Sequence, residues 1–281
     1  MHIEAQPLTG VFAAEVNGID LVNLDGDVLA ELRALMCEHE VLVVRGQSLE
    51  PAQQSAFSSR LGPFGEVPFI ATMDEFPEVI RVVKEADEGA AFNFGGAWHS
   101  DFSFQAEPPS FTILSAVDVP AWGGDTCFTS MTAAWNALHE PMRKRLRQLN
   151  AVHSARDAYS PKMQALHTGM SGMQIVCDES ANEYEVHPLV PVHPETHKEV
   201  LFFNRAYVRD IENMANDEAE SLMAFLHLHT TDVKFMYRHR WQAGDVVIWD
   251  NRSTQHFAMN DYGGFRRELR RTTIAGSVPR R

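Results

Sequence analysis

The chain has 281 residues, of which 44% are apolar and 22% are charged, with 17 Gly and 14 Pro. This is the composition of an ordinary globular protein, and it excludes a disordered, collagen-like or repetitive chain. Lys and Arg total 24 against 38 Asp and Glu, so the formal net charge is −14. Because this charge repels phosphate backbones and anionic lipids, we expect neither nucleic acid nor a membrane surface as a partner.

The cysteines and the N-terminal residues indicate in which cellular compartment the protein is expected. Three cysteines, far apart and odd in number, argue against a disulfide framework and against a thiolate zinc cluster. The N-terminal residues lack the cationic and apolar regions of a signal peptide, and no run approaches the roughly 18 apolar residues of a membrane span. We therefore expect a cytoplasmic protein with reduced, buried thiols at Cys37, Cys127 and Cys177.

The chain opens with the pattern of a helix, a strand and a second helix. Between residues 27 and 40, apolar side chains recur on one face of a helix. The run VLVVRG at 41–46 is β-branched and ends in Gly, which is typical of a short strand. The segment 48–62 predicts a helix, with Ser48 as its N-cap and Pro51 in its first turn.

Two further helices are predicted in the middle and the second half of the chain. One spans 130–149 and is interrupted near Pro141. The other spans 217–229, with Asn216 as its cap. Its buried stripe is predicted to consist of Leu222, Met223, Phe225 and Leu226.

Most of the remaining sequence predicts short strands. Runs rich in β-branched and aromatic residues, separated by Gly, Pro, Asn and Asp, occur at 79–83, 99–104, 111–117, 200–204, 233–239, 245–250 and 269–275. Many short strands without alternating helices favour a sandwich or barrel of jelly-roll type. Residues 84–97 and 150–186 have weak periodicity, and long irregular segments of this kind are typical of active-site lids.

The stretch Trp98-His99-Ser100-Asp101 is the most informative for function. In an extended strand, residues two apart project to the same face, so His99 and Asp101 can bind one ion. A second histidine, His256, follows the strand predicted at 245–250. Two histidines and one carboxylate that leave the other face of a metal open are the arrangement of non-haem Fe(II) oxygenases. The motif H-x-D is weak on its own, because the chain has 13 His.

Two other elements predict an anion site. Arg267 lies in the basic run RRELRR, after His256 in the sequence. In a strand, Arg267 would share one face with Leu269 and Arg271. A guanidinium fork suits a carboxylate. The turn GGDT at 123–126 allows a tight backbone path and offers the hydroxyl of its threonine. Each element alone is also typical of a solvated strand or an ordinary turn.

Together these residues resemble the taurine dioxygenase family of Fe(II)/2-oxoglutarate-dependent oxygenases, which includes 2,4-dichlorophenoxyacetate dioxygenase and the alkylsulfatase dioxygenases. The resemblance runs along nearly the whole chain, through VLVVRGQ, WHSDFSF, GGDT, HPLVPVHPET, WQAGDVVIWDNRSTQH and RRELRRTTIAG. It implies a single domain over residues 1–281, mainly β with flanking helices and folded as a double-stranded β-helix (jelly roll). It also implies Fe(II), 2-oxoglutarate and O2 as cofactor and co-substrates, with succinate and CO2 as co-products.

The resemblance assigns roles to the motif residues. His99, Asp101 and His256 match the iron ligands, which carry the catalysis. Arg267 and Thr126 match the arginine and the hydroxyl that bind the distal carboxylate of 2-oxoglutarate.

The resemblance also indicates a substrate site. Arg271 matches the position that holds the sulfonate in taurine dioxygenase, and Tyr207 matches a pocket aromatic of that enzyme. Phe102 belongs to a group of phenylalanines around the motif. Gly95 and Val67 stand where taurine dioxygenase has polar contacts to its substrate. Because a site specifies a ligand through buried polar partners, we expect a substrate other than taurine.

We expect a small anionic organic substrate: a carboxylate such as an aryloxyalkanoate or an amino-acid-derived acid, or an alkyl sulfonate or sulfate ester. Two other functions remain open. One is a non-catalytic jelly-roll module that binds a metal or ligand, and the other is a zinc hydrolase, since two histidines and a carboxylate also bind zinc. Neither accounts for Arg267 and Thr126. We also expect a homo-oligomer, which is the tendency of the family.

Overall fold

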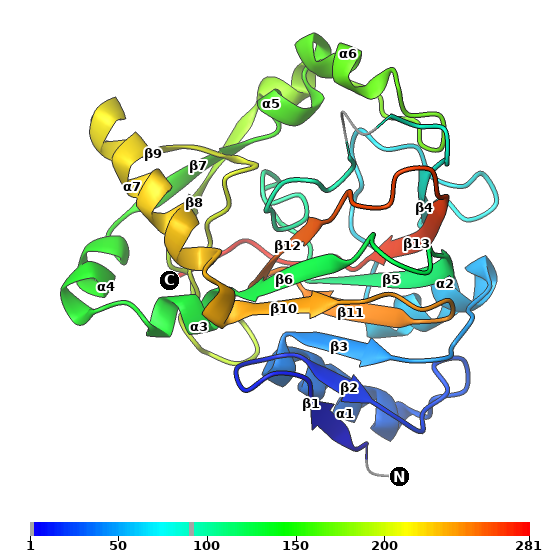
Figure 1. Ribbon diagram of the computed structural model, residues 1–281. Coiled ribbons are helices and arrows are strands. Elements are labelled where there is room, and N and C mark those ends of the chain that lie inside the picture. The colour runs from blue at the N-terminus through cyan, green and yellow to red at the C-terminus, as the bar shows by residue number, and fades with distance from the viewer. Residues whose placement is uncertain (1–2, 90–92) are drawn as a thin grey trace.

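The structure is a computed structural model that describes residues 3–89 and 93–281 (Figure 1). Its largest sheet has seven strands in the order β1-β2-β3-β11-β5-β13-β4. All neighbouring pairs are antiparallel except β2 with β3. The strands are β1 (Ala5–Pro7), β2 (Ala14–Val16), β3 (Val41–Val44), β4 (Ile80–Lys84), β5 (Phe111–Asp118), β11 (Val246–Asp250) and β13 (Arg267–Thr273).

Two smaller sheets of three strands complete the β structure. One has the order β10-β6-β12, with β6 (Thr126–Ser130), β10 (Met236–His239) and β12 (Thr254–Ala258). The other has the order β8-β7-β9, with β7 (Asn150–Ser154), β8 (Tyr184–Pro188) and β9 (Val208–Ile211). The fold is therefore mainly β with flanking helices, as the sequence predicts.

The central strands of the large sheet are buried on both faces. In β11, Val246 and Ile248 pack against the helices α1 (Gly26–His39) and α2 (Pro51–Leu61) on one face. On the other face, Val247 and Trp249 pack against aromatic residues of β6 and β10. Because successive strand residues point to opposite faces, burial on both faces requires the continuous apolar run that the sequence shows here.

Three of the remaining helices pack beside the third sheet, and two short ones lie on another side of the molecule. The core beside the third sheet includes residues of α3 (Met131–Asn136), α4 (Glu140–Leu146) and α7 (Asn216–Thr230). The short helices α5 (Arg156–Tyr159) and α6 (Gln164–His167) lie on the side of the molecule opposite α1 (Figure 1). The described residues also form three 3₁₀ turns: η1 (Pro161–Met163), η2 (Glu179–Asn182) and η3 (Val233–Phe235).

The four helical segments are confirmed, but their caps differ from prediction. The segment 130–149 is interrupted before Pro141, between α3 and α4. The N-cap of α2 is Glu50, not Ser48, and its backbone N–H donates to the side chain of Gln53.

The last helix, α7, differs from prediction at two residues. Asn216 is its first residue, and Ala215 occupies the cap position. Phe225 is 42% exposed and lies outside the buried stripe, because that stripe faces the third sheet through Leu222, Met223 and Leu226.

The prediction of a strand at 99–104 is wrong. These residues form one bridge, between His99 and His256, and then a turn in which Phe102 has φ 45°. Phe102 is buried by packing in this turn, without a strand partner. Its aromatic character therefore indicated burial correctly and pairing wrongly.

The prediction of a strand at 200–204 is also wrong. The segment is buried and lies beside 189–191, where Pro191 lacks the N–H group that a regular ladder needs. The strand predicted at 233–239 begins only at Met236, because the 3₁₀ turn η3 precedes it. Among the strands that the sequence did not predict, β6 and β12 carry site residues.

The three cysteines are free, as expected. Cys37 and Cys127 are buried, but Cys177 is only half-buried, which corrects the prediction for that residue. Among the residues that the structure describes, no helix is long and apolar enough to cross a membrane.

Candidate active site

The structure brings His99, Asp101 and His256 together at one point. The Nε2 atom of His99 lies 3.6 Å from Asp101 Oδ1, and the Nε2 atom of His256 lies 3.9 Å from the same oxygen. All three side chains are buried. The backbones of the two histidines exchange two hydrogen bonds, of 3.1 and 2.8 Å. This bridge, rather than a strand at 99–104, holds the two rings side by side.

The protonation states of the three side chains suit a metal ion. The Nδ1–H group of His99 donates to the Ala97 carbonyl at 2.7 Å, since a carbonyl only accepts, and this leaves Nε2 free to bind a cation. Burial, together with the neighbouring imidazole of His99, holds the pKa of His256 well below its ordinary value. Burial raises the pKa of Asp101, but Arg271 and the two histidines outweigh it and hold that pKa below its ordinary value. A His256 imidazole held neutral, a His99 ring whose Nε2 is left free by its bond to Ala97 and one carboxylate fit a divalent metal.

A cavity of about 540 Å³ opens over His99 and Asp101. The four residues predicted to bind substrate all line it: Gly95, Phe102, Tyr207 and Arg271. Both predicted lid segments contribute to its wall, through 93–97 and through 157–159 with 166–167. Residues 90–92 of the first segment lie outside the described part of the chain. Sequence reasoning missed several other lining residues, among them Asn93, Tyr159, Arg209 and Asn260.

Arg271 lines this cavity and contacts Asp101 of the candidate metal site. Its Nη1 atom donates to Asp101 Oδ1 at 3.1 Å, and its guanidinium carbon lies 5.0 Å from the centre of the Phe102 ring. The atoms Nε and Nη2 are buried and have no hydrogen-bond partner in the described chain. One side of the guanidinium is therefore occupied, and the other side retains unused donors.

Gly95 and Tyr207 lie against His99. Gly95 has φ +75°, and a Cβ atom at this position would stand 3.6 Å from Cε1 of His99. Because side chains are unfavourable at this φ, glycine suits the close approach of the backbone to His99. The ring of Tyr207 packs edge-on to the His99 ring, with 6.1 Å between centroids.

The predicted anion pair, Arg267 and Thr126, is assembled apart from this cavity. Arg267 is buried, and its Nη2 lies 3.4 Å from Oγ1 of Thr126. The indole N–H of Trp241 donates to the same oxygen at 3.0 Å. Gly124 has φ +68°, and a Cβ there would approach Cδ of Arg267 to 3.1 Å, so the glycine makes room for the arginine.

The charge of Arg267 is not neutralised within the described residues, where no carboxylate lies within ion-pair distance. Burial lowers the pKa of its guanidinium below the ordinary value. A buried cation without a carboxylate partner is costly. An anionic ligand beside Arg267 and Thr126 would remove that cost.

A second buried group, of Cys37, His193 and Asp250, also has three possible ligand atoms within 4.8 Å of one another. It does not suit a metal. Nδ1 of His193 accepts two backbone N–H groups, so Nε2 carries the proton and donates to Asp250 at 2.9 Å. The guanidinium of Arg252 donates to Asp250 at 2.6 Å and contacts the Cys37 sulfur, and burial raises the pKa of that thiol to about 12.

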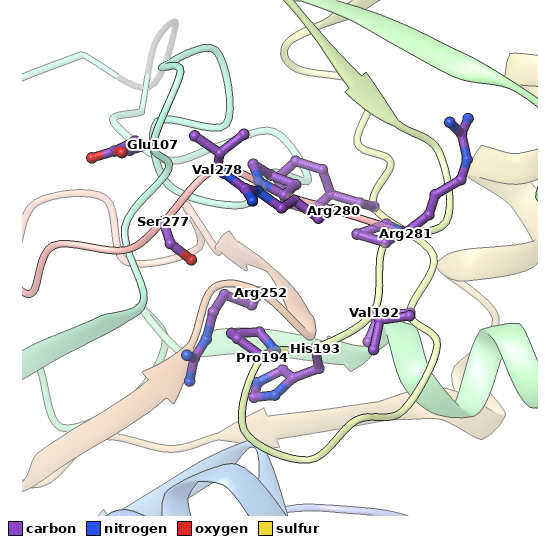
Figure 2. A pocket seen from close by; sticks show the side chains of 13 residues that line it. Glu107, Val192, His193, Pro194, Arg252, Ser277, Val278, Arg280 and Arg281 are labelled. Atoms are coloured by element: carbon purple, nitrogen blue, oxygen red, sulfur yellow. The ribbon is translucent and has the colours of Figure 1, made fainter.

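A second cavity, of about 410 Å³, adjoins this buried group. Figure 2 shows His193 and Arg252 on one side of it, and Val278 and Arg280 from the C-terminal segment on the other. None of the residues predicted for the active site lines it. It is therefore separate from the site built around His99.

His99, Asp101 and His256 form a candidate metal site, and the sequence comparison identifies the family. The model described as "Taurine catabolism dioxygenase TauD, TfdA family" matches residues 4–273. The chain belongs to this family.

Relatives and a solved structure agree with that assignment. The alpha-ketoglutarate-dependent sulfate ester dioxygenase of Pseudomonas putida is 34% identical, over 99% of this chain and 91% of its own. The alpha-ketoglutarate-dependent 2,4-dichlorophenoxyacetate dioxygenase of Cupriavidus pinatubonensis is 36% identical, over 97% of this chain and 98% of its own. A crystal structure of a putative alpha-ketoglutarate-dependent taurine dioxygenase from Burkholderia xenovorans has a TM-score of 0.82 at 32% identity, covering 99% of this chain and 94% of that one.

These findings confirm the expected class, an Fe(II)/2-oxoglutarate-dependent dioxygenase; alpha-ketoglutarate is another name for 2-oxoglutarate. They give no support to a non-catalytic module or a zinc hydrolase.

Proposed function

We propose that this dioxygenase hydroxylates a small organic anion in the cavity above His99 and Asp101, with succinate and CO2 as co-products. The observation that carries the proposal is the convergence of two histidine nitrogens and one carboxylate oxygen beneath a cavity whose wall contains a buried arginine. In this proposal His99, Asp101 and His256 are the catalytic metal ligands. Bound Fe(II), together with 2-oxoglutarate and O2, supplies the oxidation of a substrate carbon.

Arg267 and Thr126 are proposed to hold the far carboxylate of 2-oxoglutarate. Thr126 Oγ1 already accepts from Trp241 and lies within reach of Arg267, so its own hydrogen remains to be donated. The buried guanidinium and this hydroxyl form a pair of donors that suits a carboxylate.

Arg271 is proposed to bind the anionic end of the substrate, with its unused Nε and Nη2 donors. Phe102, Tyr207 and the other aromatic and apolar residues of the wall would pack the rest of the molecule. We propose a carboxylate, such as an aryloxyalkanoate or an amino-acid-derived acid, or an alkyl sulfonate or sulfate ester. Gly95 and Val67 lack the polar side chains that would favour taurine, so taurine itself is not proposed.

Further expectations are proposed with this function. The seven-stranded sheet and the sheet β10-β6-β12, which share one core, are proposed as the two faces of a double-stranded β-helix in a single domain over residues 1–281. The segments 84–97 and 150–186 are proposed as lids, because both contribute to the cavity wall. A cytoplasmic location agrees with three free cysteines. A homo-oligomer stays a prediction.

The test is succinate formation and O2 uptake with Fe(II), 2-oxoglutarate and ascorbate. The substrate panel comprises aryloxyacetates, alkyl sulfate esters, linear alkyl sulfonates, taurine and amino acids. We expect coupled turnover with one anionic class and none in a His99→Ala variant. Background turnover that does not depend on His99 would contradict the proposed metal site. Efficient turnover of taurine would contradict the proposed substrate preference.

A further inference from the structure

The carboxylate of Asp101 is held on the side away from the histidines. Its Oδ1 atom faces the Nε2 atoms of His99 and His256, and its Oδ2 atom is 2.8 Å from Oγ1 of Thr112. Thr112 belongs to β5 and is fully buried. The two oxygens of Asp101 therefore have different environments, one toward the ligand set and one toward the sheet.

Asn251 forms hydrogen bonds both with Thr112 and with the backbone of Asp101. Its Nδ2 atom lies 2.8 Å from Oγ1 of Thr112. Its Oδ1 atom accepts the indole N–H of Trp249 at 2.9 Å and the backbone N–H of Asp101 at 3.3 Å. The side chain thus touches both the threonine that binds the carboxylate and the backbone that carries it.

The direction of each hydrogen bond among Trp249, Asn251, Thr112 and Asp101 follows from which groups can only donate. Because the indole of Trp249 and the backbone N–H of Asp101 can only donate, the atom of Asn251 that they contact is its oxygen. The amide nitrogen of Asn251 must then face Thr112 and donate to it. A hydroxyl has one hydrogen, so Thr112, which accepts from Asn251, donates its own hydrogen to Oδ2 of Asp101.

Asp101 needs this support because it does not lie in a strand. It begins the turn that follows the bridge at His99, and its N–H group binds a side chain where a strand would offer a carbonyl. Without the hydroxyl of Thr112, Oδ2 would be a buried charged oxygen that has lost its donor, and the carboxylate could rotate.

We propose that Thr112 and Asn251 are positioning residues that fix the Asp101 carboxylate so that Oδ1 alone is presented to the metal. The inference rests on the proposed function, because it takes Asp101 as a metal ligand. Partners that orient a ligating carboxylate change metal affinity about 10- to 100-fold when they are removed.

The test measures Mn(II) binding by the intact protein, without 2-oxoglutarate or substrate, from the free Mn(II) signal in electron paramagnetic resonance. Thr112→Val removes the hydroxyl at nearly constant shape, and Thr112→Ser restores it. Thr112→Ala also removes the hydroxyl, and unlike valine it places no methyl group where the hydroxyl stood.

Thr273→Val is the matched control. Thr273 pairs with Thr112 across β13 and β5, is equally buried, and its hydroxyl has no hydrogen-bond partner in the part of the chain that the structure describes. The two Thr→Val changes therefore disturb neighbouring places in one sheet to a similar extent. Only the change at Thr112 removes a bond to Asp101.

We expect Thr112→Val and Thr112→Ala to weaken Mn(II) binding about tenfold or more. Thr112→Ser and Thr273→Val should bind like the wild type, and the variants compared should keep similar melting temperatures. Equal affinities of Thr112→Val and Thr273→Val would overturn the inference, as would a Thr112→Ser variant as weak as Thr112→Val. Failure of the wild type to bind Mn(II) more tightly than His99→Ala is a different result, which would overturn the proposed metal site itself.

Discussion

Arg271 donates to the same oxygen of Asp101 that faces both histidine nitrogens, at a distance of 3.1 Å. Both side chains are buried. The residue proposed to bind the substrate anion is therefore in direct contact with a proposed metal ligand. Effects on the substrate must be separated from effects on the metal when Arg271 is changed.

Arg271→Gln should raise the substrate KM at least about tenfold, because it removes the charge that is proposed to pair with the substrate anion. Succinate formation without substrate should persist. Since Arg271 is a cation beside the proposed metal ligands, its removal should leave Mn(II) binding as tight as before or tighter. Arg270→Gln is the control, because Arg270 points to the opposite face of β13 and binds the Leu49 carbonyl. A weakened Mn(II) affinity with an unchanged KM would show that Arg271 acts through Asp101 only.

Arg267→Gln should weaken 2-oxoglutarate binding about 30-fold or more, because the proposed carboxylate site would lose its buried guanidinium. Thr126→Val should cost less, about tenfold, since one neutral donor is lost. The measurement is the 2-oxoglutarate concentration dependence of succinate formation. Arg266→Gln serves as the control, because that arginine pairs with Glu85, Asp118 and Glu268. Equal KM values for Arg267→Gln and Arg266→Gln would contradict the role of Arg267.

The sequence predicts that His99, Asp101 and His256 lie together, and the structure places them in one cluster, but by a different local geometry. The spacing of His99 and Asp101 suggested a strand, whereas the structure has a bridge to His256 followed by a turn. The ligands still converge, because the bridge fixes His99 and a side-chain amide receives the backbone N–H of Asp101. Residue types indicated the chemistry, and long-range contacts determine the geometry.

The supporting contacts could not be predicted. Thr112 lies in a run that predicts an ordinary buried strand, and Asn251 follows a strand where asparagine is typical of a turn. Their roles depend on the register in which β11, β5 and β13 pair. Register is set by the packing of the whole sheet and is not written in any short segment.

Arg252→Leu should destabilise the protein by about 3–5 kcal/mol, because it leaves the buried carboxylate of Asp250 without its guanidinium partner. Asp250 is fully buried, and the charge of Arg252 holds the pKa of Asp250 below its ordinary value against the effect of burial. Arg238→Leu breaks an ion pair with Asp125 in which the arginine side chain is 52% exposed, so it should cost less than about 1 kcal/mol. Urea unfolding measures both changes. Equal losses of stability would contradict the importance of the buried pair.

Glu40 should make the protein less stable as the pH rises from about 4.5 to about 7. Burial raises the pKa of this carboxyl group from 4.5 to about 7, and the hydroxyls of Ser130 and Thr132 offset only part of that rise. The folded state therefore holds a proton that the unfolded state releases near its ordinary pKa. The stability that this proton contributes is present below about pH 4.5 and is lost as the pH rises to about 7, by an amount of about 3 kcal/mol.

Glu40→Gln keeps the shape of the side chain and removes the titration. Its free energy of unfolding, measured in urea, should equal or exceed that of the wild type at pH 8, where the wild type must bury a charged Glu40. At pH 5 its free energy of unfolding relative to the wild type should be lower by about 2–3 kcal/mol, because Glu40 is then protonated in the folded state and the wild type regains stability. A difference between the two proteins that does not change from pH 5 to pH 8 would show that Glu40 does not titrate in this range in the folded protein.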